Sequence, residues 1–305
     1  MRIVITGASG MIGSELARIS AEQGKEVIAV VRKNSAKITN LPESNNIHIV
    51  ECDLNEIEKL PEKINCKCDI FYHFAWMGVY GESRNDTLLQ TSNIEATLKA
   101  VKAAKEIGCY KFVGAGSQAE YGKQDCNLTS VTPVNPAMGY GVAKYCAGRL
   151  GAIEAKRQGI SFNWGRIISV YGEKDNAYTL VGSAIRAFLK GESVKFSQCT
   201  QIWDYLYQSD AARAFEAIGE RGKDAKTYVV GSGQGLPLKE YVKMIYDAVG
   251  NKNAKMLFGA IPNNEQAITY LCADLTELNE DTGFVPLISF KEGIKKTCSV
   301  IKDKE

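Results

Sequence analysis

The stretch TGASGMIGS, residues 6–14, sets three glycines at three-residue intervals. The run before it, Arg2–Thr6, is rich in strand-forming residues, and the run after it, 13–23, has apolar residues at helical spacing. A further strand is predicted over Glu26–Val31. Strand, glycine loop, helix and strand within about thirty residues are typical of a dinucleotide-binding turn. The sequence therefore predicts a βαβ unit that holds a dinucleotide.

Each glycine has its own physical role in such a loop. Gly7 permits the tight turn after the strand, and Gly10 lets the backbone approach a pyrophosphate at the positive end of the helix. Gly13 allows the helix to pack closely on the strand. A glycine-rich turn without a ligand is the alternative, but the strand and helix on either side favour the dinucleotide.

Strands and helices continue to alternate through the first half of the chain, which predicts a parallel sheet with helices on both faces. The predicted fold class is α/β: a Rossmann-like doubly wound parallel sheet with a smaller C-terminal α/β substrate-binding region. The further predicted strands are 48–51, 69–74, 111–114 and 161–168, and the long helices are 91–106 and 140–156.

The expected division of the chain is 1–170 for the NAD(P)-binding Rossmann domain and 171–305 for the substrate-binding region. Within the second part, 180–190 and Leu238–Val249 have helical patterns. Two β-rich runs, 204–207 and Thr227–Val230, are expected to return to the main sheet, so the boundary near residue 170 is soft.

Bulk composition excludes several classes of function. The chain has 305 residues, a net charge of +2 and 45% hydrophobic residues, as in an ordinary soluble domain. So small a charge argues against nucleic acid or a membrane surface as partner. No signal peptide or membrane-length apolar run is visible, and nine scattered cysteines indicate a reducing, cytoplasmic setting. A lone C-x-C at Cys66 and Cys68, without further ligands, predicts no metal site.

The residues after the second predicted strand bear on the cofactor. Dinucleotide folds that bind NAD place an acid there, to hold the ribose 2′-hydroxyl. Here Val31 occupies that place, and Arg32 and Lys33 follow it. A guanidinium pairs well with a 2′-phosphate, whereas a carboxylate would repel it. The sequence predicts NADP(H), with Arg32 as main contact and Lys33 or Ser35 as support; NAD is the alternative, with the two cations merely solvating a loop.

The dipeptide Asp53-Leu54 follows the third strand. Asp53 at this place suits a hydrogen bond from the adenine amino group. It suits equally well the N-cap of the segment that follows, and the two roles are compatible.

Tyr140 and Lys144 lie four residues apart in YGVAK, and so on one face of the predicted helix. A nearby ammonium favours the phenolate and lowers the pKa of a tyrosine from about 10. Such a tyrosine can exchange a proton with an alcohol or carbonyl during hydride transfer. The motif is common by chance, but together with the glycine loop it indicates an oxidoreductase.

With these motifs together, the chain resembles the extended short-chain dehydrogenase/reductases, in the NAD(P)-dependent nucleotide-sugar epimerase/dehydratase group. The resemblance runs nearly end to end and rests on TGASGMIG, DL at 53–54, FYHFAW at 71–76, Asn93, GSQAEYG at 116–122, YGVAK, GRIISVYG at 165–172 and WDYLYQSD at 203–210.

The resemblance implies a catalytic set of Ser117, Tyr140 and Lys144. Tyr140 would exchange the proton, Lys144 would lower its pKa and bind the nicotinamide ribose, and Ser117 would polarise the substrate oxygen. The expected cofactor-binding residues are Gly7, Ser9, Gly10, Met11, Ile12, Gly13, Arg32, Lys33, Asp53, Leu54, Phe74, Ala75, Tyr140, Lys144 and Ile167. The expected substrate-binding residues are Trp76, Ser117, Gln118, Ser169 and Trp203.

Several positions depart from the family pattern. The dehydratases carry an acid pair where this chain has Gln118 and Ala119, and Glu120 comes one residue late, so a dehydratase is disfavoured. Ser169 and Trp203 replace a common Asn and Arg; Trp203 is expected to plug the smaller region more than to stack on a base. Trp76, in place of a small residue, is expected to narrow the site or to pack under a lid.

These features predict an NADP(H)-dependent ketoreductase of a nucleotide-linked 4-keto-6-deoxy sugar. The alternative is an NAD(P)-dependent nucleotide-sugar 4-epimerase. Less favoured are a reductase of a non-sugar carbonyl and a non-enzymatic NADP-sensing protein. The intact catalytic set argues against the sensor. Family members often pair two helices per subunit, so a homodimer through 91–106 and 140–156 is expected.

Overall fold

A seven-stranded parallel sheet lies at the centre of the computed structural model, which describes residues 1–262 and 267–303. The strand order is β11-β6-β5-β4-β1-β2-β3, and every pairing is parallel. The chain thus switches direction between β1 and β4, where doubly wound folds bind their ligands. The strands are β1 Arg2–Thr6, β2 Glu26–Val31, β3 Ile47–Glu51, β4 Ile70–His73, β5 Lys111–Ser117, β6 Ser161–Ile167 and β11 Thr227–Val230.

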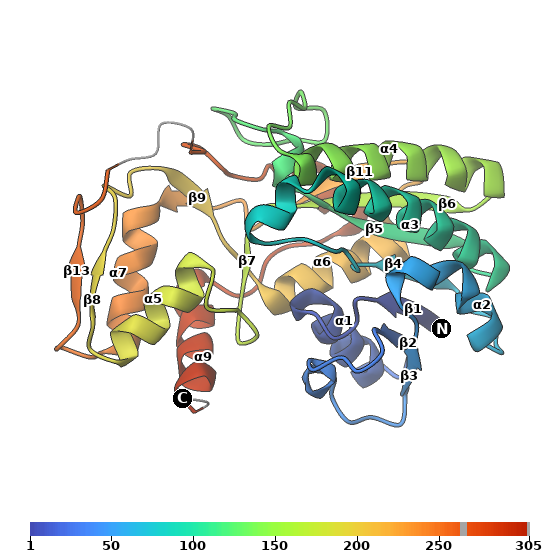
Figure 1. Ribbon diagram of the computed structural model, residues 1–305, viewed down its shortest axis with the longest axis horizontal. Coiled ribbons are helices and arrows are strands. Elements are labelled where there is room, and N and C mark those ends of the chain that lie inside the picture. The colour runs from blue at the N-terminus through green and yellow to red at the C-terminus, as the bar shows by residue number, and fades with distance from the viewer. Residues whose placement is uncertain (263–266, 304–305) are drawn as a thin grey trace.

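Helices cover both faces of this sheet (Figure 1). On one face lie α1 (Met11–Glu22) and α6 (Gln208–Arg221), and on the other α3 (Thr87–Glu106) and α4 (Gly139–Gln158). The side chains of β1 alternate between the two cores, with Ile3 and Ile5 in one and Val4 in the other. The predicted doubly wound α/β fold is confirmed.

Strand β5 runs to Ser117, beyond its predicted end at residue 114. The glycines that hid this extension from the sequence pattern make room for an aromatic ring. A Cβ at Gly114 would lie 2.2 Å from the Trp164 ring, and one at Gly116 would lie 2.3 Å from its Nε1 atom. The strand therefore continues through weak β-formers because Trp164 packs directly on their backbone.

A smaller lobe stands beside the carboxyl edge of the sheet, at the left of Figure 1. Its own core, around Phe188, Tyr241 and Ile245, joins three helices with a short parallel strand pair. Its elements are α5 Leu180–Leu189, β8 Ser193–Lys195, α7 Leu238–Val249, β13 Lys255–Leu257 and α9 Phe290–Lys302. The remaining short elements are η1 Ile38–Asn40, η2 Leu54–Lys59, α2 Leu60–Lys63, η3 Gly81–Asn85, η4 Gln118–Glu120 and α8 Thr276–Thr282.

The two late strand runs have different fates. The run 227–230 is β11 and joins the main sheet beside β6, as expected. The prediction for 204–207 is wrong: β9 (Ile202–Asp204) pairs with β12 (Gly235–Pro237), and β10 (Leu206–Tyr207) pairs with β7 (Val170–Tyr171). The physical reason is that β11 occupies the place beside β6, while the run 204–207 is held by two short strands outside the main sheet, β12 and β7.

Within residues 1–262 and 267–303, no helix combines the length and the apolar character needed to cross a bilayer.

Asp204 ties three segments together where the two lobes meet. It is fully buried, and its carboxylate accepts hydrogen bonds from Ser232 N at 2.8 Å, Ser232 Oγ at 2.6 Å, Gly233 N at 3.0 Å and Ala273 N at 3.0 Å. Removing the acceptor would leave the buried Ala273 N–H and the partly buried donors of Ser232 without this partner, which costs free energy.

We expect Asp204→Ala to lower the free energy of unfolding by about 2 kcal/mol or more, because the buried Ala273 N–H and the two partly buried donors of Ser232 lose their acceptor. Urea denaturation measures the change. Asp247→Ala, an exposed position on α7, is the matched control and should stay within about 0.5 kcal/mol of the parent. Equal stability of the two variants would contradict the role given to Asp204.

Candidate active site

A cavity of about 550 Å³ opens at the carboxyl ends of β1, β2 and β4. Its wall is made by the glycine loop, the residues after β2, the loop after β4 and a segment of the smaller lobe that includes Lys174 and Asn176. This is the crevice at the topological switch point of the sheet, the usual ligand position in doubly wound folds.

The glycine loop lies tightly against its neighbours. Gly7 has φ +67°, and a Cβ there would lie 2.8 Å from Ala75 N, while a Cβ at Gly13 would lie 2.4 Å from Gly7 O. Helix α1 starts after Gly10 without a side-chain cap, so its first N–H groups are left for another acceptor. The loop therefore fits a dinucleotide phosphate.

Not every loop residue faces the cavity. Ser9 and Met11 line it, whereas the side chain of Ile12 packs against the core under the sheet. After β4, Phe74 and Ala75 line the cavity as expected.

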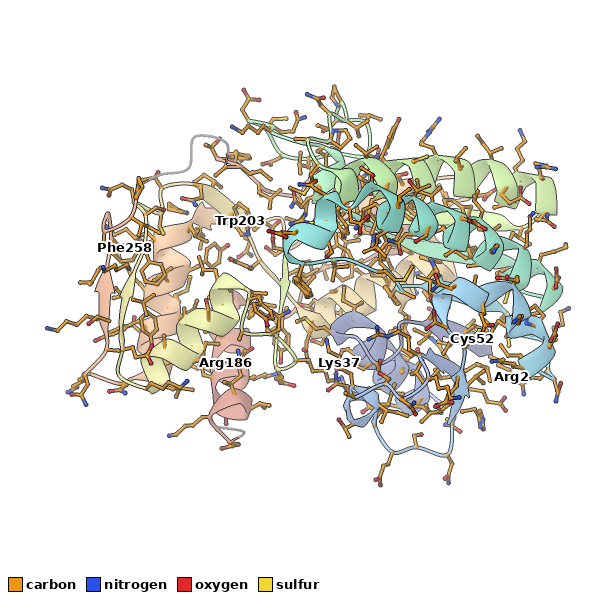
Figure 2. All side chains as sticks on the ribbon, in the orientation of Figure 1. Arg2, Lys37, Cys52, Arg186, Trp203 and Phe258 are labelled. Carbon is orange, nitrogen blue, oxygen red and sulfur yellow. The ribbon has the colours of Figure 1, made fainter. Side chains whose placement is uncertain are left out.

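The residues after β2 form a cationic part of the cavity wall. Val31 is buried at the strand end, and the exposed Arg32 lines the cavity. Lys33 does not line the cavity, whereas Lys37, four residues further on, does. Lys37 lies on the part of the molecule built on the main sheet, on the side that faces the smaller lobe (Figure 2). Lys174 adds a third cation to the wall. None of the described residues that line the cavity carries a carboxylate.

In this structure Asp53 has one of its two predicted roles, that of a helix N-cap. It is the N-cap of η2, and its Oδ1 accepts from Asn55 N at 3.1 Å. Leu54 beside it lines the cavity and Asp53 does not.

The structure brings Ser117, Tyr140 and Lys144 together next to Trp76, which lines the cavity, whereas none of these three residues lines it. Ser117 ends β5 and caps η4, and Tyr140 and Lys144 lie in the first turns of α4. Burial raises the pKa of the Tyr140 phenol, while a hydrogen bond with Ser117 and the charge of Arg84 lower it in part. The serine and the phenol thus contact each other as the predicted chemistry requires.

Lys144 has a different environment from the one expected. It is buried, its Nζ donates to Ala115 O at 2.7 Å, and it lies 3.8 Å from the centroid of the Trp76 ring. Burial lowers the pKa of Lys144 to about 7. In this structure burial raises the pKa of Tyr140, and the groups that lower it in part are Ser117 and Arg84, so the role expected of Lys144 toward Tyr140 stays a prediction.

Trp76 stands between the cavity and the catalytic set. It lines the cavity, meets the Tyr140 ring edge-on at 6.1 Å and covers Lys144. Its Nε1 donates to Gln90 Oε1 at 3.0 Å, which fixes the indole on α3. The expected narrowing of the site by Trp76 therefore has a geometric basis.

Four other predicted residues, Ile167, Gln118, Ser169 and Trp203, do not line the cavity. Trp203 donates from Nε1 to Ser169 Oγ at 2.9 Å and packs in the smaller lobe (Figure 2), which is the plugging role. Ile167 packs against the core of the sheet. The side-chain oxygen of Gln118 is buried without a hydrogen-bond partner among the described residues.

Glu120 turns into the protein and not toward the cavity. It is fully buried, and its carboxylate accepts from Ser117 N at 2.9 Å, Trp164 Nε1 at 3.0 Å and Arg166 Nε at 2.7 Å. With Ala119 unable to move a proton, this site lacks the acid pair of a dehydratase.

Sequence reasoning missed Lys37, Tyr80, Arg84, Lys174 and Asn176. Tyr80 and Asn176 line the cavity from opposite lobes, and their side chains hydrogen bond to each other. Lys174 Nζ donates to Ser14 Oγ at 2.7 Å and to Asn40 O at 3.1 Å. None of these residues belongs to a periodic or motif pattern. The only signal for them in the sequence is the group of cations after β2, to which Lys37 belongs.

Among the described residues, no cluster of three or more His, Cys, Asp and Glu side chains is arranged to hold a metal ion.

This sheet order, the glycine loop and the Ser117–Tyr140–Lys144 cluster define an extended short-chain dehydrogenase/reductase, an NAD(P)-dependent oxidoreductase or epimerase. The family model described as "NAD dependent epimerase/dehydratase family" matches residues 3–231, and the chain belongs to that family.

Two relatives, each about a quarter identical in sequence, align with nearly all of this chain. The CDP-abequose synthase of Salmonella typhimurium is 25% identical over 304 residues, 96% of each chain. The UDP-glucose 4-epimerase of Mycolicibacterium smegmatis is 26% identical over 100% of this chain and 99% of its own. In fold, the crystal structure of a UDP-glucose 4-epimerase with UDP-glucose from Thermotoga maritima is similar, with a TM-score of 0.88, 23% identity and coverage of 100% and 99%.

The buried Lys144 makes stability depend on pH. In the unfolded chain its pKa is 10.5 and in the folded chain about 7, so between these values the unfolded state binds more protons. The free energy of unfolding therefore rises with pH across that window on account of Lys144. The cost of burying the ammonium is greatest below pH 7.

We expect Lys144→Met to stabilise the protein more at about pH 6 than at about pH 9, by about 2–3 kcal/mol between the two. Urea denaturation at both values measures this difference, with Lys102→Met, an exposed position on α3, as the matched control. A stability change that is the same at both pH values would show that Lys144 is not buried as a destabilised ammonium.

Proposed function

We propose that this protein is a nucleotide-sugar 4-epimerase that uses NAD(P), with Tyr140 as the acid–base residue. The observation that carries the proposal is the contact between Ser117 and Tyr140 next to Trp76, which lines the cavity. The names of several relatives, including the mycobacterial protein, support an epimerase over a net reductase. The buried Glu120 and Ala119 argue against dehydration.

The residues of the chain divide the work as follows. The glycine loop, Met11, Leu54 and Ala75 would hold the dinucleotide, which when bound supplies reversible hydride transfer. Tyr140 takes the proton of the sugar hydroxyl and returns it, and Ser117 donates a hydrogen bond to the same oxygen. Trp76 restricts the space in which the sugar turns.

The cofactor that we propose is NADP(H), with NAD as the alternative. Arg32, Lys37 and Lys174 line the cavity, and the end of β2 carries no acid. A 2′-phosphate would be attracted by this set, and an acid-free strand end offers nothing to the 2′-hydroxyl of NAD.

The same cationic wall favours a second candidate function, net reduction of a nucleotide-linked 4-keto-6-deoxy sugar by NADPH. That reaction uses the same Ser117 and Tyr140, so the protein residues do not separate it from epimerisation. The fate of the cofactor does.

We also propose the division of labour between the parts of the chain. Residues 1–170 would bind the dinucleotide, and 171–305 would supply the nucleotide-sugar side of the site. A homodimer through α3 and α4 is supported by an outward apolar stripe on α4, made by Val142, Leu150 and Ile153, which are 39–58% exposed.

The deciding experiment incubates the purified protein with UDP-glucose, and separately with a CDP- or dTDP-linked 4-keto-6-deoxy sugar and NADPH. An epimerase inverts C4 of UDP-glucose with no net consumption of cofactor; a reductase consumes one NADPH per product. In either case Tyr140→Phe should lose about 100-fold or more in kcat while binding the dinucleotide normally. Full activity of Tyr140→Phe would refute both functions.

For the cofactor, we expect Arg32→Ala to weaken NADPH binding by about 10- to 100-fold and NADH binding little, because a charge-assisted pair with the 2′-phosphate is lost. Titration calorimetry measures both affinities. Lys33→Ala, whose side chain does not line the cavity, is the matched control and should behave like the parent. Equal affinities of the parent for NADH and NADPH, unchanged in Arg32→Ala, would exclude the proposed preference.

A further inference from the structure

Arg84 lies on the ring of Tyr140 and has no role in the motifs that identify the family. It belongs to η3, and its guanidinium carbon is 4.8 Å from the centroid of the Tyr140 ring. The Lys144 ammonium is further away, at 5.9 Å from the same centroid. Arg84 is therefore the nearer of the two cations to the phenol.

The guanidinium of Arg84 is not neutralised by the protein. Its Nε is buried without a hydrogen-bond partner, and among residues 1–262 and 267–303 no carboxylate forms an ion pair with it. A buried N–H of a cation without an acceptor costs free energy, and a ligand oxygen that reached it would remove that cost. Arg84 does not itself line the cavity, but its neighbour Ser83 does.

The chain around Arg84 holds it in place. Asn85 Oδ1 accepts from Gly139 N at 3.0 Å, which joins η3 to the first residue of α4. Gln90 Nε2 donates to Ser83 O at 2.9 Å on the other side. A Cβ at Gly139 would lie 3.1 Å from Arg84 O, so the two segments are in close backbone contact. The position of Arg84 relative to Tyr140 is thus set by the fold.

Lys144 is engaged elsewhere. Its Nζ donates to Ala115 O and lies against the Trp76 ring. A cation over an aromatic face interacts more strongly with a phenolate than with a phenol. The charged groups that act on Tyr140 are Arg84 from η3, which favours the phenolate, and Glu120 from η4 together with Tyr80 from the loop after β4, which oppose it.

We propose that Arg84 is a substrate-contacting residue of this site, which favours the Tyr140 phenolate through its charge and donates its Nε–H to an acceptor oxygen of the bound sugar. This inference rests on the proposed function, in which Tyr140 exchanges the proton. The sugar oxygen belongs to a neutral hydroxyl or to a carboxylate. In both cases an oxygen atom accepts the hydrogen bond that the guanidinium donates.

The first test measures binding and kinetics of Arg84→Met and Arg84→Lys with UDP-glucose and UDP-glucuronate. Arg84→Met should weaken sugar-nucleotide binding by about 10-fold for a hydroxyl contact and about 100-fold for a carboxylate contact, because hydrogen bonds between charged groups are stronger. A larger loss with UDP-glucuronate assigns the carboxylate. Arg157→Met, an exposed arginine on α4, is the matched control and should be unchanged.

The second test needs no turnover. A near-ultraviolet difference titration of the parent against Tyr140→Phe isolates the ionisation of this one phenol. In the Arg84→Met background the same difference should move to higher pH by about one unit or more, since the nearest cation is lost. Arg84→Lys keeps the charge, so it should restore the titration but not the sugar affinity, a split that a purely structural role would not produce.

The outcomes separate this inference from the function on which it rests. Full activity of Tyr140→Phe refutes the proposed function. Loss of activity in Tyr140→Phe, together with parental titration and parental sugar affinity in Arg84→Met, overturns only the role of Arg84. A shifted titration with parental affinities for both probes overturns the substrate contact.

Discussion

The site depends on the close contact between the glycine loop and the backbone around it. Gly13 lies so near Gly7 O, and Gly7 so near Ala75 N, that a side chain at either place would push the segments apart. Because β1, α1 and the chain after β4 meet there, the carboxyl edge of the sheet opens into one cavity. A phosphate bound at the uncapped start of α1 would then lie in that cavity, which Gly10 and Met11 line.

Charge in the inner part of the site is arranged around aromatic rings. Trp76 covers the Lys144 ammonium, and Arg84 covers Tyr140. Burial makes the ammonium easier to deprotonate and the phenol harder to ionise, so the pKa values of these two groups, which are ordinarily close together, move apart. Behind them the buried Glu120–Arg166 pair holds the Ser117 backbone. The environment of these groups, more than their identity, sets their chemistry.

The elements of the sheet were predictable because hydrophobic periodicity and glycine punctuation are local signals. Strand β2 and helix α7 have the predicted bounds, and β11 joins the sheet as expected. The extension of β5 was not predictable, because Trp164, which packs on its glycines, comes from another strand. The prediction for the run 204–207 failed for a similar reason: its partners, β12 and β7, come from other parts of the chain.

The sequence by itself determined the glycine loop, the acid-free end of β2 and the four-residue spacing of Tyr140 and Lys144, since each is a property of a short segment. Tertiary structure decided which cation after β2 lines the cavity, and that is Lys37 in place of Lys33. It also decided that Trp203 bonds to Ser169 and that Arg84 lies on Tyr140. These contacts join segments far apart in the chain, and no periodicity records them, because they arise only when the lobes and loops pack.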